Sequence, residues 1–285
     1  MGKFLAQFGV VLFLLSVPAA QARDHQQAEE LYQQTEYDAA LALLDKHSHD
    51  PDELNLLGRI HFMQGDFNKA TDCFLKALEA DPRNSNDALW LGRAYGRRAE
   101  TANFFAAPGL ATKTRVYFEL AVELNPKSSE ALADLFDYYL EAPGFLGGGY
   151  EKAARVAGQI AAINPAEGYF VHSELAQKKK DYSNAEDSLR RAIQAAPRQV
   201  GRVLDLAKFL ANQGRTRESD AVFAKAEREF PNTPRVWFAE ANVLVKEKRN
   251  LPEARRLLEK YMAAGVSPDD PPKAEAERLL RQAGA

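Results

Sequence analysis

A spacing of 34 residues recurs along this chain and constrains its fold more than any single motif does. The segment 51–84 is 34 residues long and combines the small residue Gly58 with the large Phe74. Small and large residues recur downstream, where Pro197 and Pro231 are again 34 positions apart. A fixed period of this size is typical of stacked supersecondary units, each burying its apolar face against the next. The sequence therefore predicts an array of repeats.

Each repeat predicts a pair of amphipathic helices, because apolar residues recur at i, i+3, i+4 and i+7 in two runs per unit. Prolines follow these runs and end the helices, since proline lacks an N–H and restricts the residue before it. We expect a degenerate first helix pair at 23–50, an array at 51–268 and a capping helix at 269–285. The terminating prolines are Pro82, Pro126, Pro165, Pro197 and Pro231.

The array resembles the tetratricopeptide repeat (TPR) family, in the form found in exported bacterial proteins. The family's Trp at repeat position 4 is replaced by Leu54 and Ala88, and in the latter unit a tryptophan falls two places later, at Trp90. The resemblance implies a right-handed all-α solenoid of about six to seven helix hairpins with a C-terminal capping helix. Family positions 7, 8, 11, 20, 24, 27 and 32 are occupied in the clearest unit by Leu57, Gly58, His61, Ala70, Phe74, Ala77 and Pro82.

In the family, first-helix residues line a concave groove, and the resemblance carries these positions onto the present sequence. The implied surface is aromatic and basic in the early repeats and acidic later. Trp90 with Arg93 and Arg97 is the expected contact patch, since Trp and Arg are enriched among binding hot spots; alternatively, Trp90 packs against the neighbouring helix and the arginines are solvated. The predicted partner-binding residues are Arg59, Phe62, Trp90, Arg93, Arg97, Asp134 and Asp137, and the same register also places Asn55, Met63, Leu89 and Glu141 in the groove.

Two repeats are longer than the others, and we expect enlarged loops at 96–115 and 141–153. The spacing between successive helix-terminating prolines is 44 residues from Pro82 to Pro126 and 39 residues from Pro126 to Pro165, instead of 34. Both insertions fall between the first and second helix of a pair, so they should emerge on one edge of the solenoid, which in such arrays is often the binding face.

The second insertion contains three consecutive glycines, Gly147, Gly148 and Gly149. The spacing from Gly144 to Gly149 matches a phosphate-binding loop, but Tyr150-Glu151 stand where Lys and Ser/Thr are required. We therefore interpret the glycines as a turn into the next helix. A contact from their backbone N–H groups to an anion or to a partner stays open.

The N-terminal residues 1–22 predict a cleavable signal peptide. Lys3 precedes an apolar run that ends at Pro18, and Ala20-Gln21-Ala22 forms a small-residue cleavage site. The run is shorter than the roughly 20 residues that span a bilayer. We expect export, most simply to a bacterial periplasm, with secretion elsewhere or an uncleaved membrane tether as alternatives. The mature chain has no integral membrane span in this interpretation.

Charge and motifs exclude several functions. The formal net charge of −3 gives no electrostatic reason to bind nucleic acid. Cys73 is the single cysteine, so no intramolecular disulfide forms and packing alone must hold the fold. Catalytic and metal-binding motifs such as G-x-S-x-G and H-E-x-x-H are absent from the sequence. We expect no enzyme, no cofactor and no metal.

The sequence thus favours a scaffold that binds a protein or peptide of unknown identity in the cell envelope. A rival is a small-ligand carrier, since the chain is also similar to repeat-built components associated with periplasmic solute transporters. A pocket lined by Trp90, Arg93 and the two enlarged loops would favour the carrier, and an open groove would favour the scaffold. A third possibility is a purely structural array that self-associates.

Overall fold

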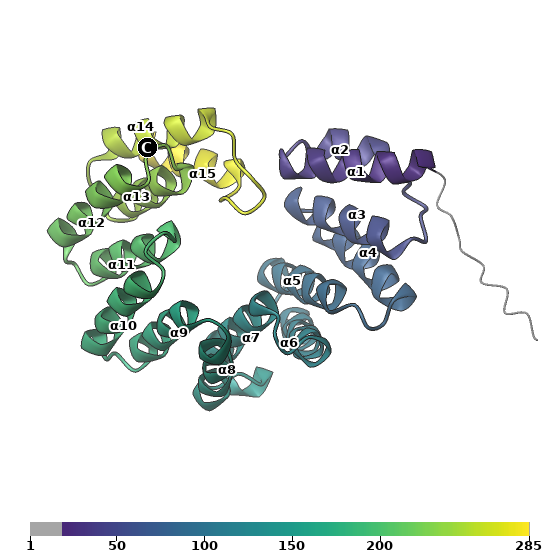
Figure 1. Cartoon of the computed structure of the whole chain (residues 1–285), viewed down its shortest axis with the longest axis horizontal. Helices are drawn as coiled ribbons and strands as arrows, with labels where there is room; N and C mark the ends of the chain where they lie inside the picture. The colour runs from purple at the N-terminus through teal and green to yellow at the C-terminus, as the bar shows by residue number, and fades with distance from the viewer. Residues whose placement is uncertain (1–18, 285) are drawn as a thin grey trace, which may run out of the picture.

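A computed structural model describes residues 19–284, which form fifteen α-helices, one short 3-10 helix and no strand. Consecutive helices pair as antiparallel hairpins that stack into an α-solenoid (Figure 1). The predicted fold class is confirmed. The pairs are α1 (Ala19–Gln33) with α2 (Tyr37–Leu43), α3 (Pro51–Met63) with α4 (Phe67–Ala80), α5 (Ser85–Thr101) with α6 (Ala107–Leu124), α7 (Ser129–Glu141) with α8 (Tyr150–Ile163), α9 (Pro165–Lys178) with α10 (Tyr182–Ala195), α11 (Val200–Asn212) with α12 (Thr216–Glu229), and α13 (Pro234–Lys246) with α14 (Leu251–Ala263).

The chain ends in a fifteenth helix, α15 (Lys273–Gly284), which packs its apolar side against α13 and α14. Leu279 is buried there, while the rest of the helix is mostly polar. Most of the predicted signal peptide, residues 1–18, lies outside the described residues, and α1 begins at Ala19. None of the helices between residues 19 and 284 is long and apolar enough to cross a bilayer.

Six of the helix starts are fixed by side-chain caps. The Asp50 carboxylate accepts hydrogen bonds from the backbone N–H groups of Asp52 and Glu53 at the start of α3. Asn84 and Asn164 cap α5 and α9 in the same way. Such caps satisfy N–H groups that have no partner inside the helix.

Five of the seven hairpins share one tight turn between their helices. In each turn, one residue takes the left-handed conformation, with φ between 52° and 81°. Around Gly65, for example, Gly65 N–H donates to Phe62 O and Asp66 N–H donates to His61 O. This pattern satisfies carbonyl groups at the helix end. The left-handed residues are Thr35, Gly65, Lys180, Gly214 and Lys248.

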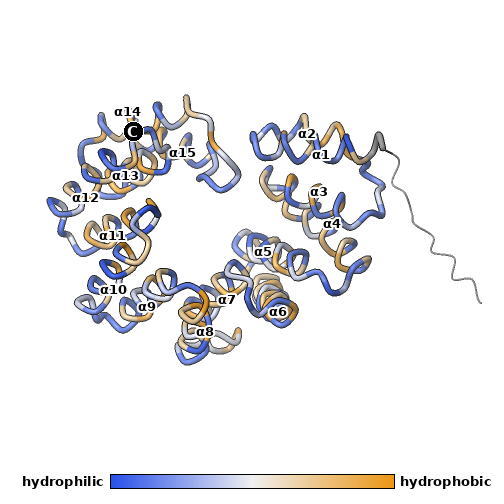
Figure 2. Tube along the Cα trace, in the orientation of Figure 1, coloured by the Kyte–Doolittle hydropathy of each residue, from blue (hydrophilic) through white to orange (hydrophobic). Residues whose placement is uncertain are grey.

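Small residues let the two helices of a hairpin approach closely. A Cβ atom on Gly58 would lie 2.5 Å from the ring of Phe74, and one on Gly92 would lie 2.5 Å from the ring of Phe118. The same glycine-to-phenylalanine packing therefore recurs in two consecutive hairpins, as the repeat pattern predicts. Figure 2 shows apolar and polar stretches alternating along the hairpins, as amphipathic helices require.

The first insertion differs from its prediction. We expected an enlarged loop at 96–115, but the extra residues lengthen both helices: α5 has 17 residues and α6 has 18. The connection between them is only 102–106. Ala-rich sequence favours helix over loop, so the insertion extends the hairpin itself. The second insertion does form an irregular segment, 142–149, which contains the 3-10 helix η1 (Gly144–Leu146).

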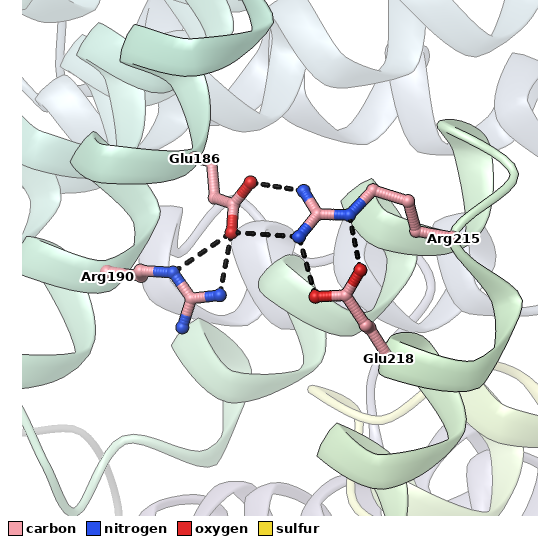
Figure 3. A network of polar contacts seen from close by, with 4 residues as sticks. All are labelled: Glu186, Arg190, Arg215 and Glu218. Atoms are coloured by element: carbon pink, nitrogen blue, oxygen red, sulfur yellow. Dashed lines mark hydrogen bonds and ion pairs between the residues drawn. The ribbon is translucent and has the colours of Figure 1, made fainter.

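Charged side chains tie neighbouring hairpins together. Arg215, at the turn before α12, bonds to Glu186 on α10 and to Glu218 on α12, and Glu186 also accepts from Arg190 (Figure 3). Hydrogen bonds from Arg215 lower the pKa of the Glu186 carboxyl. The network links two consecutive repeats outside the apolar core.

The solenoid curls until its ends face each other (Figure 1). The connection between α14 and α15 lies beside the first two hairpins, and the two regions enclose a cavity of about 230 Å³. Thr35, Tyr37 and Met63 line one side of this cavity, and the other side is lined by Val266, Ser267 and residues 270–274. Because of this strong curvature, the hairpins surround most of the concave surface.

Candidate binding groove

The concave surface contains a pocket of about 520 Å³ bordered by α5, α6, α7 and η1. Its walls are mostly apolar, with Phe62 and Phe118 on one side and Leu146 at the second insertion. Its six charged side chains come from the first helices α5 and α7. Five of the seven predicted partner-binding residues meet here: Phe62, Arg93, Arg97, Asp134 and Asp137. Their role in binding stays a prediction.

Arg93 is fixed at one wall of this pocket. Its Nε donates to Asp134 Oδ2 at 2.6 Å, and its Nη2 donates to Glu130 Oε2 at 3.0 Å. The guanidinium also lies 4.8 Å from the ring centroid of Trp90. Arg93 on α5 thus bridges to two carboxylates on α7, and its charge is neutralised within the protein.

The other predicted arginines are neutralised too. Arg59 bonds to Glu29 at 2.6 Å and lies over the ring of Tyr32. Arg97 pairs with Glu100 at 2.7 Å, although both side chains are largely exposed. The arginines therefore leave little net positive charge on the concave surface.

Carboxylates dominate the remainder of the surface. Asp137 takes part in no ion pair among residues 19–284. It is open to solvent but lies inside the curve of the solenoid, where reduced hydration and the charges of Asp134, Glu174, Glu141 and Glu167 raise its pKa to about 7. The pocket thus holds a carboxylate that has no counter-charge of its own.

The acidic character continues along later first helices, which the sequence analysis missed. Burial is the main cause that raises the pKa of Glu174 on α9 and of Asp205 on α11. Glu174 occupies the repeat position of Asp137, and Asp205 occupies that of Asp134, so continuing the register would have found both. Burial also raises the pKa of Glu240 on α13 to about 7, but its carboxylate neighbours lie on the second helices α12 and α14, so it does not belong to the groove.

Trp90 packs and also borders a cavity. Its ring meets Phe62 edge to face at 5.3 Å and stacks on Phe74 at 6.0 Å. It also lines a second cavity of about 590 Å³, together with Arg59, Arg93 and Asp269 from the far end of the chain. The Trp90 ring therefore packs against neighbouring side chains, as the alternative interpretation of the sequence expected. Arg93 and Arg97 are paired with carboxylates, and that interpretation expected them to be solvated.

Two residues that the register placed in the groove lie in the core. Leu89 is buried, and Asn55 is buried where its Nδ2 donates to Asp87 Oδ1 at 2.6 Å. The first helices face both the groove and the neighbouring hairpin, so a register that is off by a fraction of a turn places a side chain on the wrong face.

The three glycines form a turn that backbone hydrogen bonds hold in place. Gly147 has φ +88° and Gly149 has φ +148°, conformations that side chains disfavour. A Cβ atom on Gly148 would lie 1.9 Å from the carbonyl oxygen of Ala142. The N–H groups of Gly147, Gly148 and Gly149 donate to Gly144 O, Pro143 O and Tyr139 O respectively. These donors are occupied, which leaves none of the three for the anion contact that the sequence left open.

Nothing in the described part of the chain resembles a metal centre, since no three His, Cys, Asp or Glu residues of 19–284 group suitably. The Cys73 thiol is half-buried, and burial raises its pKa to about 11. A thiol that stays protonated at neutral pH is a poor nucleophile.

Comparisons with known proteins agree on the repeats. A family model described as tetratricopeptide repeat matches residues 51–84, and another with the same description matches residues 176–243. No curated protein matches the sequence.

Solved structures share the fold at low identity. A thermophilic TPR protein from Thermus thermophilus is 22% identical with a TM-score of 0.56, covering 67% of this chain and 99% of that one. A tetratricopeptide repeat protein from Parabacteroides merdae is 16% identical with a TM-score of 0.61, covering 93% and 99%. The APC/C hetero-tetramer Cut9–Hcn1 contains a chain that is 15% identical with a TM-score of 0.50, covering 94% and 49%.

Proposed function

Because the chain is a tetratricopeptide repeat protein, we propose that its concave surface binds a protein segment that presents a cationic side chain next to apolar ones. TPR arrays are protein–protein interaction scaffolds. A solenoid offers an extended concave surface on which a partner segment can lie. The question is therefore which chemistry the groove of this chain selects.

The observation that carries the proposal is the imbalance of charge in the groove. Arg59, Arg93 and Arg97 each have a carboxylate partner, whereas Asp137 and its neighbour Glu174 take part in no ion pair among residues 19–284. Charges lining a curved, partly enclosed surface reinforce one another and attract ions of opposite sign. A Lys or Arg side chain of a partner would relieve the repulsion among these carboxylates.

The apolar walls suit the rest of such a side chain. Phe62, Phe118 and Leu146 border the same pocket as Asp137 and Glu141. Lys and Arg side chains bury an alkyl stem while keeping the charged head beside polar groups. The pocket would hold the stem along the rings and the head at Asp137.

We place this activity in the cell envelope. Support comes from the N-terminal sequence, in which a charged start, a short apolar run and Ala20-Gln21-Ala22 predict a signal peptide. The partner would then be an exported protein or the exported part of a membrane protein.

A second candidate function, the binding of a small cationic ligand, is favoured by the dimensions of the pocket. Its volume of about 520 Å³ falls within the range of about 300–1,000 Å³ that is common for small-molecule sites, and its walls are mostly apolar. Arg93 and residues of both inserted segments, 96–115 and 141–153, border it, whereas Trp90 does not. It thus has only part of the lining expected for a carrier.

A peptide-display selection against the purified chain tests the proposal, alongside calorimetry with a panel of amines such as spermidine. We expect enrichment of peptides with Lys or Arg beside apolar residues. Asp137→Asn should weaken the selected peptides at least tenfold, whereas Asp187→Asn, the same change at an exposed ion pair on α10, should not. Selection of acidic peptides, or equal binding by both variants, would refute the proposal. Amine binding without peptide binding would favour the second candidate.

A further inference from the structure

The two inserted connections expose three phenylalanine side chains that nothing in the described chain covers. Phe104 is 84% exposed and Phe105 is 90% exposed in the α5–α6 connection, and Phe145 is 82% exposed in η1. Both connections join a first helix to a second helix, so they lie on the same edge of the solenoid. Of the large apolar side chains in residues 19–284, these three are the most exposed.

Both connections hold their rings in place. The Asn103 side-chain oxygen accepts from the N–H groups of Phe105 and Ala106, and the rings of Phe104 and Phe105 meet edge to face at 5.7 Å. The Asn103 side chain thus fixes the backbone that carries the two exposed rings.

The η1 turn is tied in a comparable way. The Tyr138 hydroxyl donates to Leu146 O at 3.0 Å, and Gly149 N–H donates to Tyr139 O at 2.7 Å. The Lys152 ammonium donates to Gly147 O at 2.7 Å. The Gly-rich sequence at 147–149 therefore builds a fixed support for Phe145.

The segment that carries Phe104 and Phe105 is basic, although the whole chain has a formal net charge of −3. Residues 96–115 contain four cations, Arg97, Arg98, Lys113 and Arg115, against one carboxylate, Glu100. Arg98 and Lys113 lie over the ring of Tyr95, at 5.4 and 4.9 Å, and neither takes part in an ion pair among residues 19–284. Their charges remain available to an anionic surface.

We propose that this edge, defined by Phe104, Phe105, Phe145, Arg98 and Lys113, docks on an anionic lipid surface. Aromatic rings that protrude from a protein enter the boundary between headgroups and acyl chains, and neighbouring Lys and Arg bind anionic headgroups. A bilayer accepts such rings at any spacing. A protein partner would have to supply a pocket for each ring. None of these five side chains lines the groove pocket, so the inference stands apart from the proposed function.

Site-specific labels test the inference in the full chain. Phe105→Cys, Phe145→Cys and Arg198→Cys are each made in a Cys73→Ser background and labelled with a polarity-sensitive fluorophore. Arg198 is exposed in the connection between α10 and α11, on the opposite edge, and serves as the control. The probes are vesicles of phosphatidylglycerol and phosphatidylcholine, vesicles of phosphatidylcholine alone, and spin-labelled lipid as a quencher.

We expect labels at 105 and 145 to become apolar and quenched with anionic vesicles, while the label at 198 stays in water. Adding Arg98→Glu and Lys113→Glu should raise the lipid concentration for half-maximal response at least tenfold. The label positions distinguish this edge from any contribution of residues 1–22. The proposal is overturned if 105 and 145 stay hydrated, if 198 is quenched equally, or if uncharged vesicles act as well. It is also overturned if an envelope protein, without lipid, shields both labels.

Discussion

Arg93 Nε and Asp134 Oδ2 lie 2.6 Å apart and join the first helices of two consecutive hairpins inside the concave surface. Both side chains are about one-fifth exposed, so solvent screens the pair only in part. Burial raises the pKa of the Asp134 carboxyl, and Arg93 opposes that effect. The pair therefore sets both the geometry and the charge of the pocket wall.

Removing Arg93 alone should destabilise the array more than removing Arg93 and Asp134 together. Arg93→Met leaves Asp134 and Glu130 without their counter-charge, and we expect a loss of about 1–3 kcal/mol in the free energy of unfolding. Arg93→Met with Asp134→Leu should recover part of that loss. Urea unfolding of the single and double variants measures the coupling, and additive effects would show that the two residues act independently.

The close approach at Gly148 can be compared with another glycine of the same hairpin. Gly148→Ala puts a methyl group against the Ala142 carbonyl, so the turn must move, at a cost of roughly 1–3 kcal/mol. Gly158→Ala lies on the exposed side of α8 with open space around it and should stabilise the helix by up to about 1 kcal/mol. Thermal unfolding followed by circular dichroism checks both signs. Equal effects of the two changes would contradict the packing at Gly148.

The buried carboxyl of Asp87 should make the stability of the chain pH-dependent. Burial, offset in part by the hydrogen bond from Asn55, raises its pKa to about 6, and Oδ2 has no partner. The folded state then binds a proton more tightly than the unfolded state, so the free energy of unfolding falls as pH rises from about 4 to about 6.

Asp87→Asn removes this titration. We expect the variant to be more stable than the wild type above pH 6, by about 1–3 kcal/mol, with a flatter pH profile. Urea midpoints at pH 5 and pH 8 give the comparison. A wild-type advantage that grows with pH would show that the ionised Asp87 is stabilising instead.

Binding of a cationic partner should depend on pH through Asp137. Its pKa of about 7 means that the carboxyl loses its proton as pH rises through neutrality, so affinity should increase by several-fold between pH 6 and pH 8. In Asp137→Asn this dependence should vanish. Calorimetric titration of one selected peptide at the two pH values decides the matter, with a flat wild-type profile as the contrary result.

Lys180 occupies a turn position that other hairpins give to glycine. Its φ of +60° is disfavoured for a residue with a side chain, whereas Gly65 and Gly214 take the same conformation freely. Lys180→Gly should therefore stabilise the chain by up to about 1 kcal/mol, and Gly65→Ala should destabilise it by a similar amount. Thermal unfolding tests the pair, and a reversal of both signs would mean that the turns are not equivalent.

The sequence determined the repeat architecture because its periodicity is local. Gly58 and Phe74 lie in one hairpin, and the prolines that follow the helices act on their own neighbours, so spacing alone predicts helix pairs and their boundaries. The groove residues of α5 and α7 followed from the same register. The length of the first insertion was visible too, but its Ala-Pro-Gly sequence suggested a loop, whereas Pro108 lies in the first turn of α6, where proline is tolerated.

Tertiary structure decided which charges are free. Arg93 and Asp134 are 41 positions apart, and their pairing follows from how one hairpin stacks on the next. Curvature, which sums small rotations between hairpins, brings Asp269 beside Trp90, and stacking gathers the carboxylates of the three first helices α7, α9 and α11 on one surface. The repeat pattern of the sequence does not predict those rotations, because they depend on how side chains of different volume pack at each interface between neighbouring hairpins. The sequence therefore specified the units, and the stacking of the units made the groove acidic.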